Sequence, residues 1–284
     1  MSLPKHTPYK NGEEVVKVGL EPIKEAEWLE IDNLFDSEIE LKKKLYESHY
    51  KEIHQELDLS FKSQQELLEV LQTHLKQYHP GHKITAIETS SPLKSASMMV
   101  QEDLVLMIPK EEKYFLGAAS LCAPSNWSLK EKFNDSLIDL HKYVPSYEKK
   151  IGNRVNNIFN KLPNDRIFQR FNWSIYEDAS LFQPVKSKSL VERSKTITDK
   201  NAGDRLFIRV ERQTIRRLPK TQAIAFTIRV HVDPLSSIKE DLLLIKGLKK
   251  TLINLSQGMK KYKSVDQIEA PLFSWLDKKI KNLS

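Results

Sequence analysis

Apolar and polar residues alternate along three segments in the second half of the chain, a pattern typical of β-strands with one buried face. These segments are Arg166–Tyr176, Leu206–Ile215 and Ala223–Val232. Two apolar runs separated by a short charged turn, Asp103–Ile108 and Tyr114–Cys122, predict a hairpin. The sequence therefore predicts about five strands, and their short connections favour antiparallel pairing.

Helical patterns lie before and after these strands. Phe35–Gln55 carries few apolar residues and predicts a mostly exposed helix. Ser63–Tyr78 is clearly amphipathic, begins with a capping box and ends before Pro80. Towards the end of the chain, Ser236–Lys261 predicts one long helix and Pro271–Asn282 a short one. Because strands and helices do not alternate regularly, we expect an α+β fold rather than α/β.

Length and composition are consistent with one domain. The 284 residues are 39% hydrophobic and 29% charged, which is enough apolar material for a packed core. We expect a single domain with an N-terminal helical extension over about residues 1–85 and C-terminal helices over about residues 236–284. No apolar run is long enough to span a membrane, no targeting segment is recognisable, and Cys122 is the only cysteine. We therefore expect a cytoplasmic protein without a membrane partner.

Positive charge is concentrated in one part of the chain. Lys186–Lys220 contains eleven lysines and arginines against four acidic residues, an excess equal to the net charge of +7 of the whole chain. Such a block can bind nucleic acid, phosphate or the carboxylates of a ligand, and it can also be a solvated surface. The sequence has no Gly-rich phosphate loop, no nucleophile elbow and no zinc-binding cysteine pairs, which excludes the enzyme classes built on them.

The predicted strand within this block is unusually rich in arginine. Four of the nine residues from Arg209 to Arg217 are arginines, and an arginine is costly to bury without a partner. Glu211 can pair with one of them at most. The others predict either an anion-binding site or a charged edge strand that resists aggregation.

Five segments in the same order carry a resemblance to a known family. Glu211–Pro219 (ERQTIRRLP), followed by Ala223–Leu235, resembles the signature of the alpha subunit of haem-dependent oxidative N-demethylases, a family long catalogued as a domain of unknown function. Gln222 departs from this signature, because a glycine is expected in the turn. The other similar segments are Val18–Pro22 with Trp28–Asp32, Leu121–Trp127, His141–Pro145 and Arg170–Trp173.

The resemblance implies a PAS-like fold, in which an antiparallel sheet and helices enclose a cofactor. It also implies haem b as that cofactor, with an imidazole as the axial ligand of the iron. His141 falls within a similar segment and is the expected metal ligand. Cys122 is the alternative as a thiolate, although a free cysteine is commonly a small buried residue. The histidines of the charged N-terminal helices are expected at the surface: His49, His54, His74 and His79.

With haem as the cofactor, the arginines acquire a role, because guanidinium groups can bind its two propionates bidentately. The expected catalytic residue is Glu211, either as the counter-ion of a protonated alkylamine or as a group that orients an arginine. Trp173 is expected near the cofactor as a cation–π partner, or in the core. The candidates for propionate binding are Arg212, Arg216 and Arg217, followed by Arg170 and Arg209.

The implied activity is oxidation of a small, dimethylamine-like alkylamine with dioxygen, which releases formaldehyde. Since the sequence holds no flavin or iron–sulfur motif, we expect the electrons to come from a separate flavin- or iron–sulfur-containing reductase. A haem or small-ligand sensor with the same fold is the alternative. A nucleic-acid-binding protein ranks lower, because Lys186–Lys220 lacks interleaved exposed aromatic residues.

Overall fold

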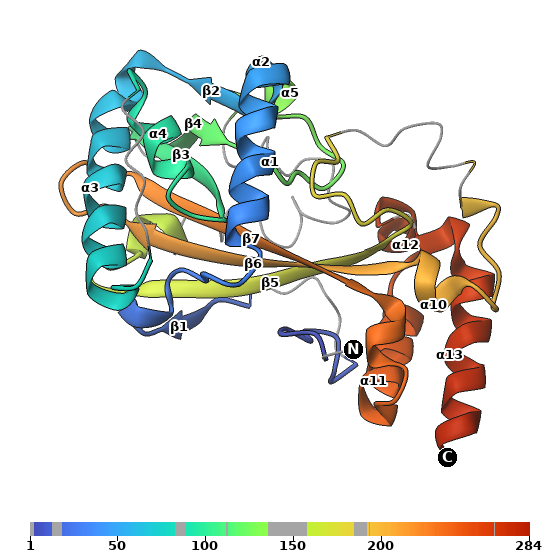
Figure 1. Cartoon of the computed structure of the whole chain (residues 1–284). Coiled ribbons are helices and arrows are strands. Elements are labelled where there is room, and N and C mark those ends of the chain that lie inside the picture. The colour runs from blue at the N-terminus through green and yellow to red at the C-terminus, as the bar shows by residue number, and fades with distance from the viewer. Residues whose placement is uncertain are drawn as a thin grey trace.

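A seven-stranded antiparallel sheet forms the centre of the protein (Figure 1). The computed structural model describes residues 3–12, 19–82, 89–111, 113–135, 158–184, 192, 194–263 and 265–284. The strand order is β1-β5-β6-β7-β3-β4-β2. The α+β prediction is confirmed, whereas the prediction of about five strands is wrong. The strands are β1 (Glu21–Ile23), β2 (His54–Glu56), β3 (Asp103–Lys110), β4 (Lys113–Ser120), β5 (Ile167–Tyr176), β6 (Phe207–Arg217) and β7 (Ile224–Pro234).

The two unpredicted strands, β1 and β2, are the edges of this sheet. Each has three residues, too few to show an alternation of apolar and polar positions. β1 pairs with β5, and β2 pairs with β4. All five predicted strands are present, and the predicted hairpin corresponds to β3 and β4.

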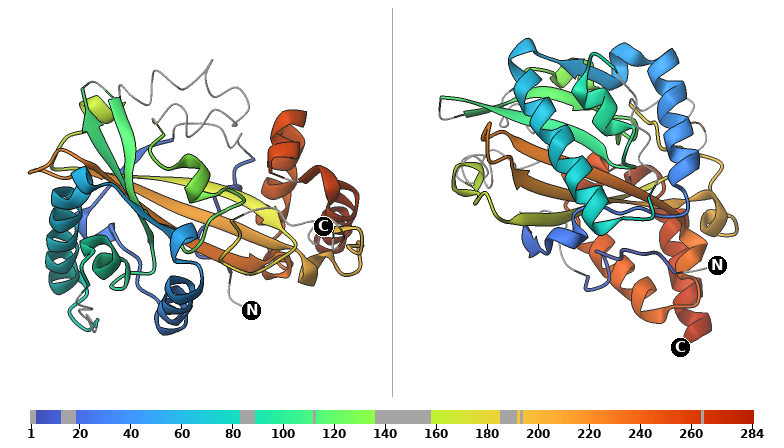
Figure 2. Two further views of the ribbon diagram at one scale, coloured as in Figure 1. Left: turned by 90° about the horizontal axis from the view of Figure 1, so that it is seen from above. Right: turned by 60° about the vertical axis from the view of Figure 1, so that its left-hand side comes forward.

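Helices pack on the sheet in two groups (Figure 2). α1, α3 and α4 pack towards one end of the long strands, and α11 and α13 pack towards the other end. Among the described residues, no helix combines the length and the apolar character that a membrane crossing needs. The helices are α1 (Phe35–Ser48), α2 (Tyr50–Ile53), α3 (Phe61–Tyr78), α4 (Pro92–Ser97), α5 (Leu129–Lys132), α10 (Ala202–Arg205), α11 (Leu242–Asn254), α12 (Gln257–Tyr262) and α13 (Glu269–Leu283). Short 3-10 turns are η1 (Glu25–Glu27), η2 (Asp58–Ser60), η3 (Leu235–Ile238) and η4 (Val265–Gln267).

The prediction of one long helix over Ser236–Lys261 is wrong, because side-chain caps divide this segment into two helices. Asp241 accepts a hydrogen bond from the Leu244 amide at 3.0 Å and starts α11. Ser256 accepts one from the Met259 amide at 3.3 Å and starts α12. Each cap satisfies an amide that has no partner within its own helix, so it favours a new start at that position.

Two further boundaries differ from the prediction near the N-terminus. α3 begins at Phe61, directly after η2, so Ser63 lies inside the first turn and is not its cap. The predicted exposed helix Phe35–Gln55 is divided into α1 and α2 and buries Lys42 on its inner face. The ammonium group of Lys42 donates to the carbonyl oxygens of Ser97, Val100 and Glu102 at 3.1, 2.9 and 2.6 Å, which compensates for its burial.

The N-terminal segment packs against α11. Tyr9 is fully buried, and its ring lies 5.4 Å from that of Trp173. The Thr251 hydroxyl of α11 donates to the Tyr9 carbonyl at 3.2 Å. At Gly247 an added Cβ would lie 2.0 Å from the carbonyl oxygen of Lys10, so only a glycine allows this close approach.

The turn between β6 and β7 depends on a carboxylate of α3. Glu66 is buried and accepts from the amides of Lys220 and Thr221 at 2.7 and 2.8 Å, and from the Thr221 hydroxyl at 2.6 Å. Gln222 closes this turn with φ of 61°, in the left-handed region that favours glycine. The turn therefore has the conformation that a glycine in the family signature would favour, although a glutamine occupies it.

We predict that Glu66→Ala lowers the free energy of unfolding by about 2–3 kcal/mol, because it leaves two turn amides without their acceptor. Chemical denaturation of the purified protein measures this change. The matched control is Glu69→Ala, on the same helix, whose exposed carboxylate pairs with the exposed ammonium group of Lys220. Equal destabilisation by both substitutions would contradict the role of Glu66 in the turn.

Candidate functional site

The three longest strands place alternate side chains on opposite faces of the sheet. Because β5, β6 and β7 pair in register, the residues that share each face follow from the pairing. The first face, called here the Glu211 face, carries Phe168, Arg170, Asn172, Arg209, Glu211, Gln213, Ile215, Arg217, Phe226, Ile228 and Val230. The second, called the His231 face, carries Gln169, Phe171, Trp173, Val210, Arg212, Thr214, Arg216, Arg229 and His231.

Glu211 lies near the middle of β6, with 9% of its surface exposed. Its carboxylate accepts hydrogen bonds from Ser125 Oγ at 2.5 Å, Gln213 Nε2 at 2.8 Å and Asn172 Nδ2 at 3.3 Å. All three donors are uncharged, so they orient the carboxylate without forming an ion pair. Such a group can accept a cationic ligand.

A buried lysine is connected to this carboxylate through Asn172. The Lys263 ammonium group donates to Asn172 Oδ1 at 3.1 Å and to the Trp173 carbonyl, while the amide nitrogen of Asn172 donates to Glu211. Burial lowers the pKa of Lys263 to about 8; the charge of Glu211 opposes this shift and that of Arg170 adds to it. Lys263 therefore loses its proton far more readily than an exposed lysine does.

The Glu211 face becomes apolar towards β7. Phe168, Phe226 and Ile228 are half-buried there, and they belong to the same apolar cluster as the buried Ile215 and Ile224. This surface, called here the apolar floor, is adjacent in the sheet to Glu211 and Arg170. Its half-buried side chains suit a flat, largely apolar ligand whose polar groups lie at one edge.

Two of the predicted arginines on this face are bonded to loops. Arg209 is 2% exposed and donates to the carbonyl oxygens of Ala123, Ser180 and Leu181 at 2.8, 3.1 and 2.9 Å. Arg217 donates to the Leu162 carbonyl at 2.8 Å and also to the Phe159 carbonyl. These guanidinium groups fix the loops against the sheet.

Arg212 and Arg216 lie on the opposite face from Glu211. Arg212 donates to the Trp28 carbonyl at 3.1 Å and to the Glu27 carbonyl. Arg216 binds Glu25 at 2.7 Å and stacks 4.3 Å above the ring of Trp28. A ligand on one face cannot reach all five predicted arginines, because the structure divides them between two faces.

Of the predicted propionate-binding residues, the half-buried Arg170 lies on the Glu211 face, paired across the sheet with Gln213. Trp173 is 2% exposed and belongs to the core beneath the C-terminal helices, on the other face. The alternative of a charged edge strand is wrong, because β6 pairs along its whole length with β5 and β7.

The predicted axial ligand, His141, lies outside the described residues. Two histidines expected at the surface are buried: His54 bonds to Tyr46, and His74 packs on Trp28. For the alternative ligand, burial and, to a smaller extent, the nearby Asp103 raise the pKa of the Cys122 thiol to about 12. A thiol that stays protonated is a poor iron ligand, which argues against Cys122.

The depressed pKa of Lys263 predicts a rise in stability with pH. Between pH 8 and 10.5 the unfolded chain binds more protons at Lys263 than the folded protein does, so the free energy of unfolding increases as the pH rises through this range. We predict that the free energy of unfolding of the wild type rises by an amount on the order of 3 kcal/mol over this pH range, and that Lys263→Met lacks this rise. Denaturation at several pH values measures the difference from the wild type. The exposed Lys239→Met variant is the control and should follow the wild-type curve.

One family matches the sequence over nearly its whole length. It is described as haem-dependent oxidative N-demethylase, alpha subunit-like, and the match extends over residues 19–273. This range begins just before β1 and ends inside α13, so it includes the whole sheet, with Glu211, Lys263 and the apolar floor. The resemblance found in the short segments is thereby confirmed: the chain belongs to the haem-dependent oxidative N-demethylase alpha-subunit-like family.

Proposed function

We propose that this chain is the haem-binding subunit of an enzyme that removes a methyl group from a small, dimethylamine-like alkylamine with dioxygen. Membership of the family supports the haem dependence and the oxidative N-demethylation. The observation that carries the amine substrate is Glu211, an oriented and nearly buried carboxylate beside an apolar surface. We also propose that the cofactor is haem b and that the sheet is PAS-like.

The residues of the Glu211 face fit a haem group. The apolar floor of Phe168, Phe226 and Ile228 suits the macrocycle, and Arg170 is the arginine of this face that we propose for the propionates. When bound, haem supplies the redox chemistry with dioxygen. We propose His141 as the axial ligand, because it falls within a segment that resembles the family and because Cys122 is buried as a neutral thiol.

Glu211 has two tasks in this proposal. Its charge attracts the alkylammonium group out of water, and its fixed orientation holds the nitrogen in one position. Ser125, Asn172 and Gln213 keep the carboxylate from turning away. Asn172 also connects Glu211 to Lys263, whose pKa of about 8 leaves it mostly protonated at neutral pH, so this lysine supplies positive charge near the carboxylate.

A separate reductase supplies the electrons in this proposal. The family description names an alpha-like subunit, which supports the existence of further subunits. We propose that this partner contains a flavin or an iron–sulfur cluster, since the chain has no motif for either.

We predict that Glu211→Gln raises the KM for dimethylamine by roughly tenfold or more and leaves the Soret band unchanged, because it removes the charge and keeps the shape of the side chain. Formaldehyde release in the presence of a reductase measures the activity. Glu69→Gln, at an exposed position of α3, is the matched control. Wild-type kinetics in Glu211→Gln would exclude Glu211 as the amine-binding residue. If the wild-type protein shows a Soret band but releases no formaldehyde from any small alkylamine, the alternative of a haem sensor without catalysis would be favoured.

We predict that His141→Ala loses or shifts the Soret band of the purified protein, because the iron loses its imidazole ligand. His49→Ala removes a half-buried histidine of the N-terminal helices and should leave the spectrum unchanged. Far-ultraviolet circular dichroism checks that both variants are folded. An unchanged Soret band in His141→Ala would rule out this ligand, and its absence from reconstituted wild-type protein would overturn the proposed function.

A further inference from the structure

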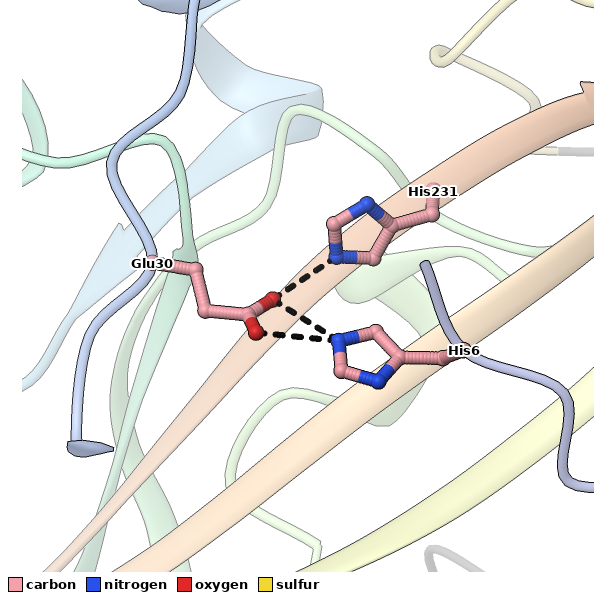
Figure 3. Close-up of side chains that lie close together, drawn as sticks. All are labelled: His6, Glu30 and His231. Carbon is pink, nitrogen blue, oxygen red and sulfur yellow. Dashed lines mark hydrogen bonds and ion pairs between the residues drawn. The ribbon is translucent and has the colours of Figure 1, made fainter. Parts of the chain in front are cut away.

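Two histidines and a glutamate meet on the His231 face (Figure 3). His6 belongs to the N-terminal segment, Glu30 to the segment before α1, and His231 to β7. The His6 Nε2 atom lies 2.9 Å from Glu30 Oε1, and the His231 Nε2 atom lies 2.8 Å from Glu30 Oε2. Both imidazoles thus direct the same nitrogen to one carboxylate, although the three residues are far apart in the sequence.

The spacing of these atoms is that of a metal site. One potential ligand atom from each residue lies within 4.8 Å of the others. In a tetrahedral site, zinc–ligand bonds of about 2.0–2.1 Å place ligand atoms about 3.4 Å apart, somewhat more than the 2.9 and 2.8 Å hydrogen-bond distances between the imidazole nitrogens and the carboxylate. An ion could therefore bind after small side-chain rotations and without a change of the backbone.

The surroundings hold these three side chains in place. The His6 ring packs 4.9 Å from Phe171 and 5.0 Å from the His231 ring. The Glu30 amide donates to Glu102 at 2.8 Å, and 11% of the side chains of Glu30 and His231 is exposed, against 19% for His6. The Glu30 carboxylate is also contacted by the ammonium group of Lys5 at 2.9 Å, so three side chains converge on it.

We propose that His6, Glu30 and His231 bind a first-row divalent transition metal ion, with zinc as the best fit. Two imidazoles and one carboxylate are a ligand set that proteins use for zinc, with a fourth position left for water. The two nitrogen ligands favour such ions over magnesium and calcium, which prefer oxygen. Asp233 lies two residues beyond His231 on the same face of β7.

Two cationic side chains compete with a metal ion at Glu30. The Lys5 ammonium group lies 2.9 Å from Oε1, but its side chain is 51% exposed, so a metal ion can displace it at little cost. Arg212 Nε lies 3.8 Å from the same oxygen and remains there, because it donates to Gln169 at 3.0 Å. Lys5 is therefore a removable competitor. Its removal should strengthen metal binding, whereas removal of either histidine should abolish it.

A metal ion here would join three parts of the chain on the face opposite to Glu211. It would link the N-terminal segment and the segment before α1 to β7, in the interior of the sheet. The proposal does not depend on the proposed catalytic function, since none of its residues lies on the Glu211 face.

The test is isothermal titration calorimetry with Zn²⁺ on the full-length, metal-stripped protein without a histidine tag. We expect saturable binding of one ion per chain and a higher melting temperature with zinc present. His6→Ala and His231→Ala should each lose this binding. Lys5→Ala should bind zinc several-fold more tightly, because the competing charge is gone. The control His49→Ala should bind like the wild type.

Absence of one-to-one binding by the wild-type protein would overturn the proposal. Binding that persists unchanged in both His6→Ala and His231→Ala would also overturn it, because the ion would then sit elsewhere. If His231→Ala fails to fold, His6→Ala still tests the proposal, because His6 lies outside the sheet. Zinc binding and the Soret band are separate measurements, so the failure of this proposal is distinguishable from failure of the haem proposal.

Discussion

Buried guanidinium groups on β6 and β7 need oxygen acceptors, and the position of the surrounding loops depends on this need. An unpaired buried cation costs several kcal/mol. Arg209 finds its acceptors in the loops around residues 123 and 181, and Arg217 in the segment before β5. Arg212 and Arg229 lie directly opposite each other, and carbonyl and carboxylate oxygens of residues 27–38 surround them. The arginines thus hold segments of the chain against both faces of the sheet.

On β6, the charged side chains that hold the structure together are not the one proposed to bind a ligand. Most arginines of β6 are bonded to the protein itself, so the basic stretch is not an exposed anion-binding face. Glu211 differs, because the three side chains that donate hydrogen bonds to it are neutral, and Arg209 and Lys263 act on it only through their charges. The same strand therefore holds the loops with its arginines and offers a single carboxylate on one face. Its opposite face contributes to the surroundings of the His6–Glu30–His231 cluster.

The sequence predicted what depends on local periodicity and missed what depends on distant partners. Alternation located the three long strands, whereas two continuous apolar runs located β3 and β4, in which consecutive residues are buried. It could not show that Lys42 is buried, since the carbonyl oxygens that receive its ammonium group lie more than 50 residues away. Most acceptors of Arg209 and Arg217 are main-chain atoms, which leave no motif. Glu211 was found from its place in the arginine strand, whereas Lys263 and the pairing of His6 with His231 carried no local signal.

The packing of Tyr9 against α11 has a consequence for the synthesis of the chain. Within this chain, the N-terminal segment leaves the ribosome well before the Thr251 hydroxyl that bonds Tyr9, which is 242 positions downstream. Because Gly247 and Trp173 also contact this segment, its binding site is completed only after α11 has been synthesised. The segment therefore docks late, after the strand and the helix that receive it have formed.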